Sequence, residues 1–142
     1  MAAALLASAC AAPAHHEAAP DARVTVDFPP EMRDHTLANM RDHLATLQRI
    51  QGDLAAGRYD EASRLAESRL GLTSLEAHGA HDLSRFMPEG MQAAGTAMHR
   101  AASRFAIAAS DAGATGDLRP ALAALSDVTA NCVACHAAYR LR

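Results

Sequence analysis

Alanine is the feature that most restricts how this chain can fold, because it supplies 36 of the 142 residues. Alanine is the strongest helix former and loses almost no side-chain entropy when a helix forms. Residues that favour strands are scarce, since aromatic residues make up only 4% of the chain and tryptophan is absent. The composition therefore predicts an all-α domain, and it argues against a β-sandwich, a β-barrel and an α/β sheet.

Length and charge narrow the functional classes. A chain of 142 residues is typical of one domain. All 13 basic residues are arginines, and 16 acidic residues outnumber them, so the formal net charge is −3. Because this balance gives no basic field for a nucleic acid, we expect no such partner. We expect a small helical domain in which cysteine, methionine and histidine carry the chemistry.

Residues 1–10 form a short apolar segment that resembles the end of a secretory signal. It is too short to cross a bilayer, which takes about 20 apolar residues. Its last part, Leu6-Ala7-Ser8-Ala9-Cys10, looks like a bacterial lipobox, in which the cysteine carries a lipid after cleavage. The alternative is an ordinary signal cleaved at a nearby small residue. Either interpretation predicts a periplasmic lipoprotein or soluble protein, with membrane contact only through a lipid on Cys10.

Residues 11–29 are biased toward alanine and proline and have no helical periodicity. Such a composition predicts a flexible linker between the signal and the folded domain. His15 and His16 lie in this segment, where we expect them to be solvated rather than to bind a metal.

Helical periodicity begins after the linker and continues through residues 30–142. Apolar residues recur at steps of three and four from Met40 to Leu54, which is one face of a first helix. Further helices are expected to begin at Asp60, at Pro88-Glu89 and at Asp117, with a turn over residues 111–116 and an ambiguous stretch over residues 71–87. Four amphipathic helices with short connections predict an antiparallel up-down-up-down four-helix bundle. Three helices with an extra loop element are the alternative.

Cys132-Val133-Ala134-Cys135-His136 is a C-x-x-C-H motif, which is typical of covalent haem attachment. Thiols at i and i+3 lie on one face of a helix, so both reach one porphyrin edge, and His136 would bind the iron as proximal ligand. A thioredoxin-like site would need a βαβ context, a disulfide inside a helix would be strained, and zinc would need further ligands at a recognised spacing. The motif therefore predicts one covalent haem c.

The distal iron ligand should come from the first helix, whose start lies beside the end of the last helix in an antiparallel bundle. Met32, His35, Met40 and His43 are the candidates. Met40 and His43 each lie within about 35° of the centre of the apolar stripe, whereas Met32 and His35 are more than about 100° away. The geometry leaves Met40, with His43 as the alternative, or an open sixth position.

The C-x-x-C-H motif near the C-terminus of a four-helix chain resembles the family of cytochromes c′ and b562. The tail His136-Ala137-Ala138-Tyr139-Arg140 and the first-helix pair Asn39-Met40 are similar to the haem-binding ends of that family. The resemblance covers about residues 30–142 and implies Met40 as the distal ligand of a low-spin, six-coordinate iron. Members with an empty sixth position carry an apolar residue over the iron and a basic residue one turn earlier, whereas here Thr36 stands one turn before Met40. This difference favours the six-coordinate branch.

Several other residues are candidates for the haem pocket. Arg41 and Arg140 could pair with haem propionates, and solvated helix faces are the alternative for both. Tyr139 and Phe105 could form walls of the pocket, and general core packing is the alternative for Phe105. A set of histidines and a methionine also invites a copper site, but their spacing supports none: His78, His81, Met87 and His99.

These features together predict an exported c-type cytochrome that carries single electrons between redox partner proteins. The alternative is a five-coordinate protein that binds NO or CO, and a third interpretation is a structural lipoprotein whose haem serves folding. No acid–base set is visible, so we do not expect an enzyme. Related bundles often dimerise, which makes a homodimer an open expectation.

Overall fold

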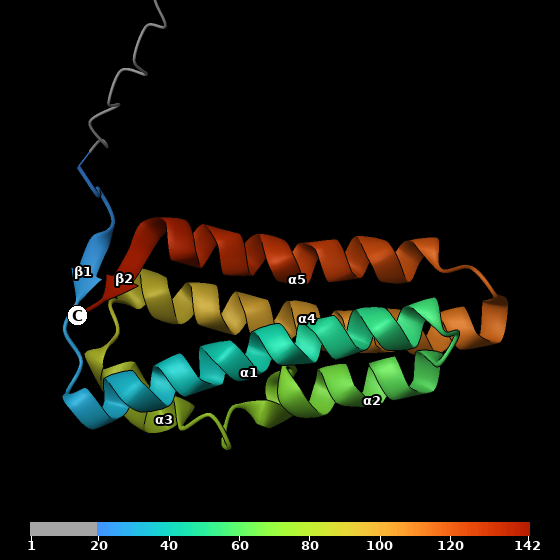
Figure 1. The fold of residues 1–142 in the computed structure, drawn as a ribbon, viewed down its shortest axis with the longest axis horizontal. Coiled ribbons are helices and arrows are strands. Elements are labelled where there is room, and N and C mark those ends of the chain that lie inside the picture. The colour runs from blue at the N-terminus through green and yellow to red at the C-terminus, as the bar shows by residue number, and fades with distance from the viewer. Residues whose placement is uncertain (1–19) are drawn as a thin grey trace, which may run out of the picture.

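The computed structural model describes residues 20–142, and helices account for 76% of these residues. The expected signal at residues 1–10, Cys10 and the histidine pair of the linker lie outside the described residues. Four long helices and one short helix follow one another along the chain (Figure 1): α1 (Pro30–Ala55), α2 (Tyr59–Arg69), α3 (Ala80–Leu83), α4 (Glu89–Thr115) and α5 (Arg119–Ala138). The prediction of a mostly helical domain is confirmed.

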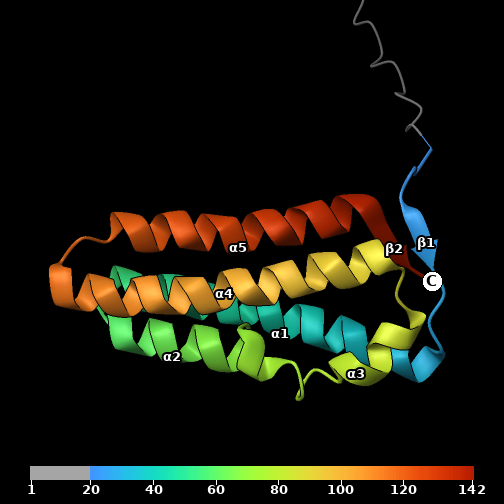
Figure 2. The same cartoon turned by 180° about the vertical axis from the view of Figure 1, so that it is seen from behind.

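The long helices lie side by side and alternate in direction, as Figures 1 and 2 show from opposite sides. α2 packs on α1, α4 packs on α2, and α5 packs on α4. The main core lies between them and contains Ile50, Leu70, Phe105 and Val128, each at most 1% exposed. Seven alanines in this core are also at most 1% exposed: Ala62, Ala66, Ala101, Ala102, Ala109, Ala112 and Ala121. Their small side chains let the helices approach closely, so the alanine excess is used for packing.

The helix starts and stops have simple local causes. Pro30 occupies the first turn of α1, where its fixed φ suits a helix and its missing N–H costs nothing. Gly57 follows α1 with a φ of 70°, a left-handed conformation that favours glycine. α5 begins near Asp117, whose Oδ1 accepts a hydrogen bond from the backbone N–H of Arg119 at 3.1 Å.

The turn expected over residues 111–116 is wrong for most of that segment. α4 continues to Thr115, and only Gly116 leaves the helix, with a φ of 74°. Ala112 is buried in the main core, and this packing keeps the segment helical despite its small residues and glycine.

The ambiguous stretch over residues 71–87 does not continue the second helix. α2 ends at Arg69, and two single turns of 3₁₀ helix flank α3 at Leu72–Ser74 and Ser84–Phe86. The carbonyl of His78 in this stretch accepts hydrogen bonds from Asn39 Nδ2 at 3.1 Å and from His35 Nε2 at 3.0 Å. Two side chains of α1 therefore anchor the segment.

A short strand near the start of the described residues pairs with one near the C-terminus, and neither strand was expected. β1 (Val24–Val26) pairs in parallel with β2 (Tyr139–Leu141), and the register places Val24 opposite Tyr139. Val26 and Phe28 are buried with Leu83 in a second, smaller core. The linker prediction is therefore wrong for residues 24–28, because these residues bury apolar side chains and pair their backbone with β2.

Candidate functional site

The C-x-x-C-H motif lies in the last two turns of α5, which ends at Ala138. Cys132 and Cys135 are both half-buried free cysteines, and Cys132 packs against the main core. Burial raises the pKa of both thiols, so they are neutral at physiological pH. The side chain of His136 is exposed.

Much of the apolar surface of α5 is left uncovered. One face of α5 packs on α4 through Ala121, Leu125 and Val128. Leu122 and Val133 are 49% and 68% exposed. The helix is long and apolar enough to cross a membrane by length and composition, with a mean hydropathy of 1.2, yet only 17% of that apolar stretch is buried. Most of the apolar surface of α5 is therefore not covered by other residues of the described part of the chain.

Helical spacing shows which other residues of α5 lie on the same side as His136. Leu122, Thr129 and His136 are seven residues apart, so they lie along one side of α5, next to the face that packs on α4. The motif histidine thus shares a partly apolar flank that α4 does not cover.

α1 has a matching uncovered flank. Arg69 Nη2 lies 2.6 Å from Asp42 Oδ1, so the side of α1 that carries Asp42 faces α2. Leu37, Met40 and Leu44 lie on the opposite flank, turned away from α2. Met40 is 37% exposed and Leu44 is 71% exposed. α1 therefore presents an apolar flank that carries the predicted distal ligand.

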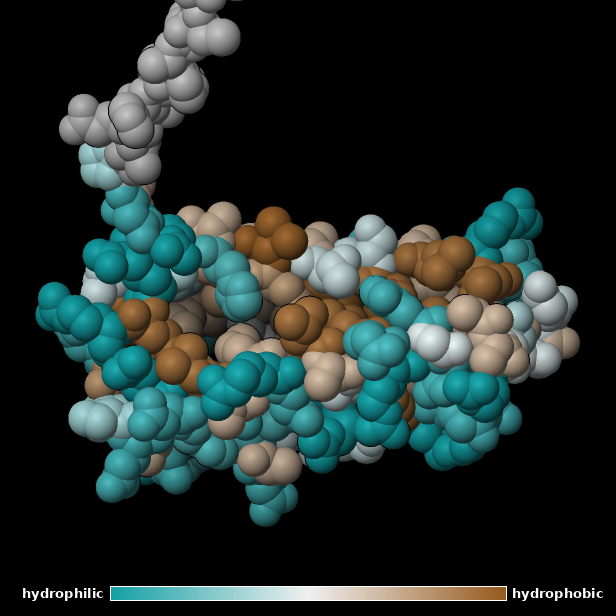
Figure 3. Space-filling model, viewed as in Figure 1, coloured by the Kyte–Doolittle hydropathy of each residue, from teal (hydrophilic) through white to brown (hydrophobic). Residues whose placement is uncertain are grey.

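The two uncovered flanks border one opening in the bundle. Between residues 30 and 138, α1 and α5 make almost no contact with one another, in contrast to the other neighbouring pairs of long helices. Figure 3 shows the surface hollowed between these two helices, with apolar residues along the rim. The C-terminal end of α5 lies at the same end of the bundle as the start of α1 (Figure 1). The fold thus brings the motif and the first half of α1 to the same region.

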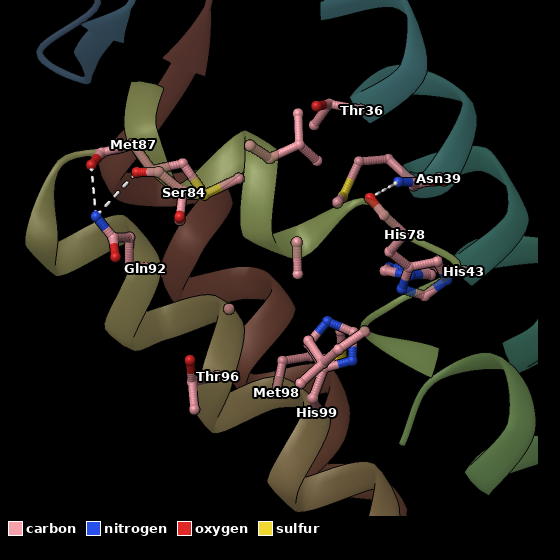
Figure 4. Close-up of a pocket in the computed structure, with 15 residues that line it drawn as sticks. Thr36, Asn39, His43, His78, Ser84, Met87, Gln92, Thr96, Met98 and His99 are labelled. Atoms are coloured by element: carbon pink, nitrogen blue, oxygen red, sulfur yellow. Dashed lines mark hydrogen bonds between the residues drawn. The ribbon is translucent and has the colours of Figure 1, made fainter. Parts of the chain in front are cut away.

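A cavity of about 180 Å³ lies between α1, the 71–87 segment and α4 (Figure 4), and Met40 is among its lining residues. Gly95 of α4 also lines it, and nothing lies within 4 Å of the position that a Cβ would take there. A glycine inside a helix costs about 0.5–1 kcal/mol relative to alanine. The open space beside Gly95 leaves room for a bulky group.

A covalent haem would need donors and apolar walls of this kind. α5 would supply two thiols and an imidazole, α1 would supply a thioether, and both helices would supply apolar flanks. Gly95 leaves room beside Met40. The fit does not depend on any residue outside positions 20–142.

The two candidates for the distal ligand differ in exposure. His43 is only 7% exposed, and its imidazole lies against His78 and His99, with ring centroids 4.7 and 6.0 Å away. Met40 lies on the flank that borders the opening. Both side chains line the cavity, Met40 from its exposed flank and His43 from a buried position.

Sequence reasoning set aside a copper site that included His78 and His99, and it did not predict that these two residues meet His43. Burial lowers the pKa of His43 to about 4 and lowers the pKa of His78 and His99 as well. His43 Nε2 is buried and has no hydrogen-bond partner. The three residues come from α1, the 71–87 segment and α4, so no local spacing could have shown that they meet.

The remaining candidates for the pocket are dispersed. Phe105 is 1% exposed in the main core and does not line the cavity. Tyr139 packs against the smaller core, and Arg140 Nε lies 3.5 Å from Asp21 Oδ2. Arg41 is exposed on α1. Only Tyr139 and Arg140 directly follow the motif helix.

Within residues 20–142, no group of three or more His, Cys, Asp or Glu side chains is arranged to hold a metal ion. Comparison of the chain with models of protein families, with curated proteins and with solved structures found no match.

Proposed function

We propose that this protein is a c-type cytochrome that binds one haem through thioether bonds from Cys132 and Cys135 and carries single electrons. His136 would be the proximal iron ligand and Met40 the distal ligand. When bound, the haem supplies a one-electron iron couple, and ligation by Met and His raises its potential. The observation that carries the proposal is the pair of uncovered apolar flanks on α1 and α5, which border one opening and carry Met40 and His136.

The chain's own residues would exclude water from this site. Leu37 and Leu44 on α1 and Leu122 on α5 present side chains that are partly or mostly exposed in the described structure. Covering apolar surface stabilises a complex by roughly 25 cal/mol per Å² removed from water. A large apolar cofactor in the opening would therefore stabilise the fold as well as bring the redox centre.

The proposal includes location and partners. The protein would work in the periplasm with redox partner proteins, either soluble or held by a lipid on Cys10. Neither a nucleic acid nor a catalysed reaction forms part of it.

Optical spectra of the purified protein test the proposal, after expression in a host that attaches haem to C-x-x-C-H motifs. We expect haem that stays bound under denaturing conditions, a low-spin spectrum, and the weak long-wavelength band of Met–iron ligation in the oxidised state. A chain with no covalent haem would contradict the proposal.

The second candidate function is binding of NO or CO at an open sixth position. The cavity beside Met40, about 180 Å³ in volume, favours it, because a diatomic ligand would have room there. A high-spin spectrum that shifts when CO is added would select this function over electron transfer.

A further inference from the structure

The outer face of α4 carries exposed side chains of two kinds, apolar and charged. Figure 2 shows α4 in front, between α2 and α5, on the side of the bundle opposite the opening between α1 and α5. Ile107 on this face is 65% exposed, and Leu72, which follows α2, is 42% exposed. Both residues line a shallow groove of about 440 Å³ between α2 and α4. A partner that covers the groove would remove this apolar surface from water.

Three charged residues share the face of α4 that carries Ile107. At about 100° per residue, Arg100, Arg104 and Asp111 all lie within about 60° of Ile107 around the helix axis. All three are exposed, and none of them forms an ion pair with another residue in the range 20–142. The face therefore has two unpaired arginines before Ile107 and one unpaired aspartate after it.

This order of charges makes the face complementary to itself. Arg100 and Asp111 lie at equal distances on either side of a point between residues 105 and 106. When a two-fold axis passes through that point, Arg100 of each copy lies opposite Asp111 of the other copy, and the stem of Arg104 lies opposite Ile107. A parallel pairing would place like charges opposite one another, which is unfavourable. The charges therefore select an antiparallel pair of helices.

The groove beside α4 is acidic. Asp111 and Glu67 line it, and no basic residue does within the described part of the chain. Although burial raises the pKa of Glu67, hydrogen bonds from Ser103 and Thr73 outweigh this effect and lower the pKa, so the carboxyl group is ionised at neutral pH. A guanidinium is the side-chain group whose geometry best matches a carboxylate. An arginine from a second copy of the chain therefore fits this groove.

We propose that two copies of this chain associate through the outer faces of α4, with the two helices antiparallel and Arg100 of each copy paired with Asp111 of the other. An interface built on one helix and one groove belongs with small, transient interfaces, which bury less than about 1,200 Å² in total. We therefore expect a dimer that dissociates on dilution. The proposal goes beyond the haem function and does not depend on it, because this face lies away from the opening.

Sedimentation velocity of the purified holoprotein, from micromolar to millimolar concentration, measures the association. We expect monomers at the low end of this range and dimers at the high end. Ile107→Ser should weaken the dimer at least about tenfold, because each copy loses an apolar contact at the interface. Unchanged far-UV circular dichroism would show that this variant and those below still fold.

Charge reversal tests the antiparallel register. Arg100→Asp and Asp111→Arg should each stay monomeric, since each variant places like charges opposite one another across the two-fold axis. A mixture of these two variants regains opposite charges at both contacts, so a heterodimer should form. Arg49→Asp is the matched control, because Arg49 is exposed on α1 and the substitution changes the net charge as Arg100→Asp does. It should dimerise like the wild type.

Four outcomes would overturn the proposal. The first is a wild-type protein that stays monomeric at millimolar concentration. The second is a dimer that persists in Asp111→Arg. The third is a mixture of Arg100→Asp and Asp111→Arg that stays monomeric. The fourth is an equal loss of the dimer in Arg49→Asp and Arg100→Asp, which would show that net charge rather than this face controls the association.

Discussion

The guanidinium of Arg69 lies 2.6 Å from the carboxylate of Asp42, and this ion pair joins the middle of α1 to the last turn of α2. The pair lies on the side of α1 that faces α2, next to the buried residues that pack α1 into the bundle. The flank with Met40 is consequently turned to the opening beside α5. The Arg69–Asp42 pair and Met40 thus lie on opposite sides of α1.

Arg69→Ala should lower the free energy of unfolding by about 0.5 kcal/mol, since partly exposed ion pairs contribute about 0.2–1 kcal/mol. Its side chain is 53% exposed and that of Asp42 is 36% exposed, so solvent screens the pair. Urea unfolding measures the change. Arg64→Ala removes a more exposed pair with Glu61 and serves as the control. A loss above about 2 kcal/mol for Arg69→Ala would mean that the pair does more than a surface contact.

Met40→Ala should convert the haem iron from low spin to high spin, because it removes the proposed distal thioether. Absorption spectra of the oxidised and reduced protein measure the conversion. Met32→Ala is the control, since Met32 packs against the smaller core. An unchanged spectrum in Met40→Ala would exclude Met40 as the ligand and move the test to His43.

Stability should fall as the pH is lowered from about 6.5 to about 4. The unfolded chain binds a proton at His43 with the ordinary pKa of 6.5, whereas burial keeps the folded protein from doing so until the pH reaches about 4. Protonation therefore favours the unfolded state in this window, by about 3 kcal/mol once the pH is below both values. His78 and His99 act in the same direction.

Urea unfolding at a series of pH values measures this dependence, and His43→Leu should make it smaller, with the part due to His78 and His99 remaining. His81→Leu is the control and should keep the full dependence, because His81 is exposed. Equal slopes in the wild type and in His43→Leu would show that His43 is not the responsible group.

Phe105→Ala should destabilise the protein by about 3–5 kcal/mol, because the ring is 1% exposed in the main core. Since Phe105 does not line the cavity, the haem spectrum of the folded variant should stay the same. Thermal unfolding and absorption spectra measure the two effects. Phe86→Ala, at a ring that is 39% exposed, should cost less. A shifted haem spectrum in Phe105→Ala would return Phe105 to the pocket wall.

Gly95→Leu should reduce haem incorporation, because its side chain would fill the space beside Met40. The measurement is the ratio of haem absorbance to protein after purification. Gly52→Leu is the matched control, since Gly52 also lies in a helix, has open space around it, and is on the exposed face of α1. Equal haem content in both variants would show that the haem does not occupy the space beside Gly95.

The helices of this protein could be predicted because their causes are local. The steps of three and four from Met40 to Leu54 and the proline before Glu31 depend only on neighbours in the chain. The prediction failed where packing outweighed local preference, as at Ala112, which the core holds inside α4. The second helix could not be delimited, because Gly71 leaves its end ambiguous in the sequence.

The candidate site divides in the same way. The C-x-x-C-H motif is complete within five residues, and the face of Met40 follows from the periodicity of one helix. The histidine cluster could not be predicted, because its members meet only after α1, the 71–87 segment and α4 have packed.

The sequence by itself determined a mostly helical chain, the starts of most long helices and the C-x-x-C-H motif, since each depends on residues within a few turns of one another. The tertiary structure alone decided the pairing of β1 with β2, the opening between α1 and α5, and the cavity of histidines and methionines. Arg142 Nε lies 2.9 Å from Asp27 Oδ1 across 115 residues of sequence. Contacts of this kind form only when the whole bundle closes, because the chain must first lose the conformational entropy that keeps such distant residues apart.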